Sequence, residues 1–183
     1  MRNVYLLRHG QTLWNAQRRY LGSTDQPLSP EGRAALAGRT GPPADRLYVS
    51  PLVRCRETAE ILYPAMAQQV VEDLRECDFG VFEGRTYEEL RDDPAYQQWL
   101  DSAGEIPPPR GEGKAACRER TVRAFLELVE RADRAAFVVH GGTIMTLMET
   151  LEDSGEFYRW QVGNGQGLHC QWDGGRLLYM GNV

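Results

Sequence analysis

The chain has 183 residues, enough for one domain of ordinary size with a buried core around a sheet. Its formal net charge is −5, so we expect its overall field to repel nucleic acid and anionic membrane surfaces. No segment approaches the roughly 20 consecutive apolar residues of a membrane span. The sequence therefore predicts a single domain over residues 1–183 with no nucleic-acid or membrane partner, in which any anion-binding site is built locally.

The four cysteines indicate a cellular compartment. Cys55, Cys77, Cys117 and Cys170 lie far apart, form no C-x-x-C pair, and are not preceded by an apolar export segment. This pattern is typical of free thiols in a reducing environment. We therefore expect four unpaired thiols and a cytoplasmic protein.

The first half of the chain alternates between apolar strands and helices. Residues 3–7 are too short for a helix and predict a buried strand. A helix is expected from Pro30 to about Arg39, with Ser29 as its N-cap. A second strand at 45–50 leads into a helix that Pro64 ends, and a third strand is expected within 68–74.

The second half repeats the alternation after a small helical insertion, expected around residues 86–110. Apolar residues at helical spacing predict an amphipathic helix over 112–132. A strand at 136–139 and a helix at 143–151 follow, and the last segment predicts a hairpin that turns at 173–175. The fold class expected is α/β, with three α/β/α layers, a mostly parallel central sheet and an antiparallel edge.

Residues that carry chemistry follow the ends of the predicted strands. Arg8 and His9 follow the first strand, Arg54 lies in the first turn after the second, Glu76 follows the third, and His140 follows the strand at 136–139. In open α/β sheets, ligands bind beyond the carboxyl ends of the strands, where the next helices point their N-termini. We therefore expect these five side chains to converge at one rim of the sheet.

Two guanidiniums, two imidazoles and a carboxylate suit a phosphate monoester. A guanidinium donates two parallel hydrogen bonds to phosphate oxygens. The positive charge of an arginine beside His9 disfavours protonation of the ring, which keeps His9 neutral and nucleophilic. A histidine nucleophile can form a covalent intermediate, with the phosphoryl charge matched by Arg8, Arg54 and a protonated His140. Glu76 is the candidate to protonate the leaving oxygen, although spacing alone does not exclude Glu83 in the same loop. This chemistry requires no metal and no organic cofactor.

Five segments in order resemble the signature segments of the histidine phosphatase superfamily, also called phosphoglycerate mutase-like. They are "LLRHGQTLWN", "YLGSTDQPLSPEG", "VSPLVRCRETAE", "LRECDFGVFEG" and "VVHGGT". The resemblance implies a phosphoglycerate mutase-like fold and a phosphorylated nucleophile at His9. It implies that Arg8, Arg54 and His140 hold the phosphoryl group and that Glu76 donates the proton. The predicted substrate contacts are Asn15, Gly22, Ser23 and Gly141.

Within the superfamily, "DFGVFEGRTYEEL" and "PPPRGE" most resemble small bacterial phosphatases, among them α-ribazole-5′-phosphate phosphatases. The sequence departs from that pattern at Phe82, where a tryptophan is usual, and at "PRGEG", which replaces Pro-Gly-Gly-Glu-Ser. Both departures lie near the expected substrate mouth, whose wall we expect to include residues 79–82, Tyr96, Trp99 and residues 107–110. The sequence therefore does not identify the leaving group of the substrate.

The predicted function is a metal-independent phosphomonoesterase that acts on a small phosphorylated metabolite. One alternative is a cofactor-dependent phosphoglycerate mutase, which must exclude water from the phosphohistidine with a lid or tail. The chain stops soon after its final hairpin and its insertion is modest, which disfavours the mutase. A second alternative is a non-catalytic phosphate-binding module, although nucleophile, acid and both arginines are all present.

Overall fold

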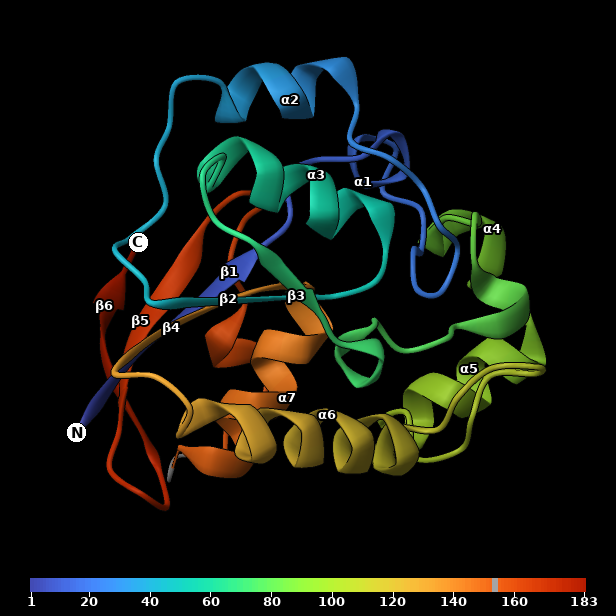
Figure 1. The fold of residues 1–183 in the computed structure, drawn as a ribbon. Coiled ribbons are helices and arrows are strands. Elements are labelled where there is room, and N and C mark those ends of the chain that lie inside the picture. The colour runs from blue at the N-terminus through green and yellow to red at the C-terminus, as the bar shows by residue number, and fades with distance from the viewer. Residues whose placement is uncertain (153–154) are drawn as a thin grey trace.

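The computed structural model describes residues 1–152 and 155–183 and is built on one six-stranded sheet (Figure 1). The strands are β1 (Arg2–Arg8), β2 (Arg46–Val49), β3 (Gln68–Val70), β4 (Arg134–Val139), β5 (Gly167–Trp172) and β6 (Leu177–Asn182). Their order is β3-β2-β4-β1-β5-β6, in which β1 to β4 pair in parallel and β5 and β6 pair antiparallel. The prediction of a mostly parallel sheet with an antiparallel C-terminal edge is confirmed.

Helices cover both faces of the sheet (Figure 1). On one face lie α2 (Pro30–Leu36) and α3 (Val53–Leu62), and on the other lie α6 (Lys114–Val129) and α7 (Gly141–Leu151). Alternation along β1 supplies both cores, because Val4 and Leu6 pack with α6 and α7 while Leu7 packs with α3. The three layers expected from the sequence are therefore present.

The remaining helices are short and lie mostly in the connections. They are α1 (Leu13–Ala16), α4 (Tyr87–Leu90), α5 (Pro94–Asp101) and the 3₁₀ turns η1 (Glu72–Leu74), η2 (Gly80–Phe82) and η3 (Tyr158–Trp160). Phe82, Leu90 and Tyr96 form a satellite core beneath α4 and α5. Phe82 and Tyr96 are 0% and 1% exposed and pack inside this satellite core, and their place in the wall of the substrate mouth stays a prediction.

Two sequence-based expectations need correction between β3 and α6. The third strand ends at Val70, and the chain turns into η1 where the strand was expected to continue. Cys77 and Cys117 form a disulfide, with 5.7 Å between their Cα atoms, so the prediction of free thiols is wrong for this pair. It is confirmed for Cys55 and Cys170, which are free and buried. None of the helices in the described ranges combines the length and apolar character needed to cross a membrane.

Candidate active site

The site lies where β1 and β4, neighbours in the sheet, reach their carboxyl ends. These strands pair in register up to Arg8 opposite Val139, so the residues that follow them, His9 and His140, leave the sheet side by side. Their ring centroids are 5.3 Å apart in an edge-to-face arrangement. The parallel pairing, which nothing in the local sequence specifies, brings together two histidines 131 positions apart along the chain.

His9 is fixed as a neutral imidazole with one nitrogen committed. Its Nδ1 lies 2.6 Å from the carbonyl oxygen of Gly10, and because a carbonyl only accepts, Nδ1 must carry the proton. Burial, with the positive charge of Arg54, holds the pKa of His9 well below its usual value. A neutral ring protonated at Nδ1 leaves the lone pair on Nε2, which is the state a nucleophile requires.

Two arginines, the half-buried Arg8 and the fully buried Arg54, lie near the histidines with their hydrogen-bonding capacity partly unused. Arg8 donates from Nη1 to the Val162 carbonyl at 2.8 Å, and Arg54 donates to the carbonyls of Thr24 and Gly22 at 2.9 and 2.7 Å. The Nε atoms of both arginines are buried and have no hydrogen-bond partner among the described residues. Because buried donors are normally satisfied, two such N–H groups beside a histidine pair point to an anionic ligand.

Glu76 enters the same cluster from the loop after η1 and meets the N-terminus of α7. Its Oε2 accepts from the Gly142 N–H at 3.1 Å, and its Oε1 accepts from the Cys77 N–H at 3.0 Å. Burial raises the pKa of Glu76, although both hydrogen bonds and the charges of Arg54 and Arg8 oppose that rise. A carboxyl with a raised pKa is suited to give up a proton and take one back near neutral pH.

Glu83, the competing carboxylate, has a different environment. It accepts hydrogen bonds from the backbone N–H groups of Ser23, Thr24 and Phe79 and from both hydroxyls of Ser23 and Thr24. Burial alone would raise the pKa of Glu83, but these hydrogen bonds together outweigh it and lower the pKa. Glu83 therefore ties two loops together as a carboxylate, and the structure favours Glu76 as the acid.

His140 is the N-cap of α7 and is fully buried. Its Nε2 lies 2.7 Å from Oγ of Ser50, the residue after β2, which orients the ring. Burial, followed by the charge of Arg54, holds the pKa of His140 well below its usual value. Burial therefore opposes the protonated His140 expected from the sequence, whereas a bound phosphate dianion would favour the imidazolium.

The predicted substrate contacts surround this cluster. Asn15 closes a capping box at the start of α1, and the carbonyl of Gly22 holds Arg54. Ser23 is bound to Glu83, so its side chain supports the loop. Gly141 lies against Arg8, whose Nε would be 3.3 Å from a Cβ added there.

Sequence reasoning missed Asn164, whose side chain hydrogen-bonds to the main chain of His9. Its Nδ2 lies 3.2 Å from Asn15 Oδ1 and 3.3 Å from the His9 carbonyl. The neighbouring Gly165 donates its N–H to the carbonyls of Arg8 and His9 at 3.1 and 3.0 Å. The only sequence signal was "GNGQG", which does predict a loop but gives no indication that it packs beneath His9.

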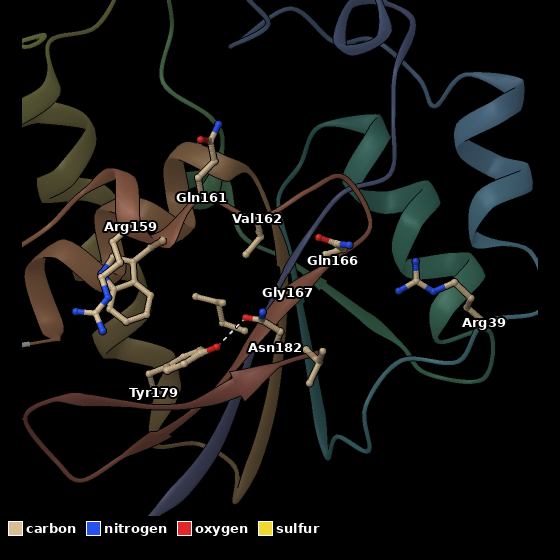
Figure 2. Close-up of a pocket in the computed structure, with 11 residues that line it drawn as sticks. Arg39, Arg159, Gln161, Val162, Gln166, Gly167, Tyr179 and Asn182 are labelled. Carbon is tan, nitrogen blue, oxygen red and sulfur yellow. Dashed lines mark hydrogen bonds between the residues drawn. The ribbon is translucent and has the colours of Figure 1, made fainter.

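A separate pocket of about 610 Å³ lies beside β5 and β6 (Figure 2). Arg39 and Arg159 lie at opposite ends of it, and Val162 and Gln166 lie between them. None of the predicted site residues lines this pocket. Two of its lining residues contact Arg8: the Val162 carbonyl accepts from Arg8 Nη1 at 2.8 Å, and the Gln166 carbonyl accepts from the Arg8 backbone N–H at 2.8 Å.

Comparison with known sequences identifies proteins related to this chain. The profile of the histidine phosphatase superfamily (branch 1) matches residues 4–180. "Probable phosphoglycerate mutase GpmB" from Klebsiella pneumoniae is 34% identical over 162 residues, covering 82% of this chain and 75% of that one. The protein of the same name from Serratia proteamaculans is 34% identical over 166 residues, with the same coverage.

Solved structures agree with the fold. TTHB049 from Thermus thermophilus superposes with a TM-score of 0.76 at 34% identity and 98% coverage of both chains. A structure named phosphoglycerate mutase from the same organism gives a TM-score of 0.75 at 34% identity, also with 98% coverage of both chains. A protein from Escherichia coli that carries the name α-ribazole-5′-P phosphatase gives 0.86 at 23% identity, covering 98% of this chain and 94% of that one, a likeness of fold.

Proposed function

Because this chain belongs to the histidine phosphatase superfamily and is an enzyme that acts on phosphate esters, we propose that it hydrolyses phosphate monoesters through a phosphohistidine at His9. One observation carries the proposal: the buried Nε–H groups of Arg8 and Arg54, which have no partner within residues 1–152 and 155–183, lie near a histidine whose Nε2 carries the lone pair. The substrate is a small phosphorylated metabolite, bound by its phosphoryl group.

In the first half-reaction, His9 Nε2 attacks phosphorus and the bond from phosphorus to the ester oxygen breaks. Glu76, whose pKa burial raises, gives a proton from its protonated form to the departing oxygen. Arg8 and Arg54 stabilise the phosphoryl oxygens, and the charge that accumulates favours protonation of His140. In the second half-reaction, water attacks phosphorus, Glu76, now a carboxylate, takes the proton of that water, and the bond between phosphorus and His9 Nε2 breaks. Inorganic phosphate leaves, and the lone pair returns to His9 Nε2.

The test is to trap the intermediate. The purified protein, quenched in alkali after mixing with labelled p-nitrophenyl phosphate, should carry acid-labile phosphate on His9. His9→Ala should carry none and lose turnover. His169→Gln is the matched control, because His169 lies on β5 away from the site and hydrogen-bonds to Asn3 at 2.9 Å. Retained turnover in His9→Ala would overturn the proposal.

The names of the GpmB relatives favour a second candidate, a phosphoglycerate mutase. Both reactions use the same phosphohistidine, and they differ in whether water or a second substrate oxygen takes the phosphoryl group. A coupled assay with 3-phosphoglycerate separates them, because a mutase would isomerise it much faster than it releases inorganic phosphate. Binding of phosphate esters with no release of alcohol would instead support a non-catalytic phosphate-binding module.

The leaving group is the least constrained part of the proposal. We propose α-ribazole 5′-phosphate as one candidate, on the resemblance of residues 78–90 and 107–112 to small bacterial phosphatases. A panel of α-ribazole phosphate, 3-phosphoglycerate and sugar phosphates, ranked by kcat/KM, tests it. A sugar phosphate far ahead of the others would exclude the ribazole assignment and leave the phosphohistidine chemistry intact.

A further inference from the structure

The disulfide between Cys77 and Cys117 joins the loop that carries the proposed acid to helix α6. We infer that this pair is a thiol–disulfide exchange site, and that its redox state controls how firmly the carboxyl of Glu76 is held in the active site. The co-reactant is a dithiol reductant. The inference rests on the proposed function in one respect, the role of Glu76 as the proton donor.

On the loop side, the crosslink begins one residue from the carboxyl it affects. Cys77 follows Glu76 directly, and its backbone N–H is one of the two donors to the Glu76 carboxylate, at 3.0 Å. The other donor is Gly142 at the start of α7, at 3.1 Å. The disulfide therefore restrains the residue that supplies half of the hydrogen bonds to the Glu76 carboxylate.

On the helix side, α6 holds the same loop by noncovalent contacts as well. Arg120, one turn after Cys117, donates from Nη2 to the Glu76 carbonyl at 3.1 Å and from Nη1 to the Arg75 carbonyl at 2.8 Å. Figure 1 shows the chain after β3 lying over α6. Because Arg120 remains when the disulfide opens, we expect reduction to loosen the loop rather than release it.

The chemistry of exchange is favoured at one sulfur. Cys77 is half-buried, whereas Cys117 is 3% exposed, so attack of an incoming thiolate at the more exposed residue, Cys77, is favoured and Cys117 leaves as a thiolate. Arg120 Nη2 lies 3.4 Å from Cys117 Sγ and stabilises that leaving thiolate, although the carboxylate of Glu112, within 4.8 Å of both sulfurs, opposes it.

The exchange balances as two electrons and two protons. The first thiolate of the reductant forms a mixed disulfide with Cys77, and its second thiol then displaces Cys77. The products are two protein thiols and one oxidised reductant, with no other co-reactant.

The other two cysteines do not compete for the reductant or for oxidation. Cys55 and Cys170 are both buried, and burial raises the pKa of each thiol to about 12. Thiols so rarely ionised exchange slowly.

The experiment compares the wild-type protein oxidised and reduced by dithiothreitol. Alkylation after unfolding should count two free thiols in the oxidised form and four in the reduced form. Reduction should lower kcat on an alkyl phosphate, whose leaving oxygen needs a proton, by about tenfold. This is less than the roughly 10²- to 10⁴-fold loss when a general acid is removed, because the acid is only loosened. On p-nitrophenyl phosphate, whose leaving group is stable as an anion, the change should be under about twofold.

Two variants isolate the cause. Cys77→Ser with Cys117→Ser should behave as the reduced form and should not respond to dithiothreitol. Cys170→Ala, which removes a buried thiol away from the site, should respond as the wild type does. Two results would overturn the inference. One is four free thiols after the reduced protein is equilibrated with oxidised dithiothreitol. The other is an equal effect of reduction on kcat for both esters.

A second readout needs no turnover. With ¹³C at the glutamate carboxyl carbons, the Glu76 signal should titrate to a higher pH midpoint in the reduced form, because a hydrogen bond that favours the carboxylate is weakened. If neither form hydrolyses any phosphate ester but this midpoint moves, the proposed function fails and the exchange site stands. Identical titrations in both forms would overturn the exchange site whatever the activity.

Discussion

At the scale of single residues, Arg8, His9 and His140 could be predicted as candidates because they lie at the ends of strands whose apolar pattern is visible, whereas Glu76 lies in a loop beyond η1. Arg8 and His9 end one such run and His140 ends another, and parallel strands bring their ends to one rim. Asn164 could not be predicted in this way, since it lies in an irregular loop and acts through backbone carbonyls. The pairing of Ser50 with His140 likewise requires knowing that β2 and β4 are neighbours.

The two carboxylates can be separated by pH dependence. Glu76→Gln should lower kcat on an alkyl phosphate by about 10²- to 10⁴-fold, the range for a lost general acid. Since the step needs the protonated form, wild-type activity should fall as pH rises through the raised pKa of Glu76, and that limb should vanish in Glu76→Gln. Glu83→Gln should keep the limb and instead cost about 1 kcal/mol of unfolding free energy, because an amide accepts the hydrogen bonds from Ser23, Thr24 and Phe79 less strongly than a carboxylate does. Loss of the limb in Glu83→Gln alone would reverse the assignment.

Asn164→Ala tests whether the side chain of Asn164 holds the main chain of His9 in position for catalysis. It removes the donor that joins Asn15 to the His9 carbonyl, so we expect kcat/KM on p-nitrophenyl phosphate to fall about tenfold, or about 1.4 kcal/mol of transition-state stabilisation. Thermal unfolding monitored by circular dichroism shows whether the fold is kept. Unchanged kcat/KM in a folded variant would contradict the role.

At the scale of elements, the sequence predicted helices and strands where the periodicity was long, as in α6, and failed where a short apolar segment was ambiguous. Val71 ends the pairing with β2, and Leu74 turns into the core through η1 instead of extending the strand. The disulfide was missed for a related reason. Cys77 and Cys117 are 40 residues apart, and only the packing of η1 and its loop on α6 brings them together.

The N-terminus of α7 needs glycine at its second position because the acid packs directly on it. A Cβ at Gly142 would lie 2.5 Å from Glu76 Oε1, closer than nonbonded atoms approach. Gly142→Ala should therefore displace the carboxyl and lower kcat on an alkyl phosphate in the direction of Glu76→Gln, with a smaller loss on p-nitrophenyl phosphate. Gly113→Ala is the matched control, since its Cβ would have no neighbour nearer than 3.8 Å. Equal loss on both esters would indicate general misfolding instead.

At the scale of the whole molecule, the site places two buried neutral histidines in a protein whose other described histidine, His169, lies on a strand away from the site. Burial and the two arginines hold the pKa values of His9 and His140 well below their usual range. The unfolded chain therefore binds more protons than the folded one below about pH 6.5, the ordinary histidine pKa. The charge arrangement that serves a phosphoryl group thus makes the folded state sensitive to mild acid.

The free energy of unfolding should accordingly fall as pH drops from about 6.5 toward 5, by up to about 1.4 kcal/mol per pH unit for each histidine. In this window the carboxylates with lowered pKa values, such as Glu83, stay ionised, whereas Glu76, whose pKa burial raises, takes up a proton in the folded state and partly opposes the fall caused by the histidines. Urea unfolding at half-unit pH steps measures it, with the salt concentration held constant. His9→Gln combined with His140→Gln should flatten the curve, whereas His169→Gln should leave it as steep as in the wild type. Inorganic phosphate, which favours the imidazolium of His140, should also reduce the slope, and an unchanged slope in the double variant would mean that other groups cause it.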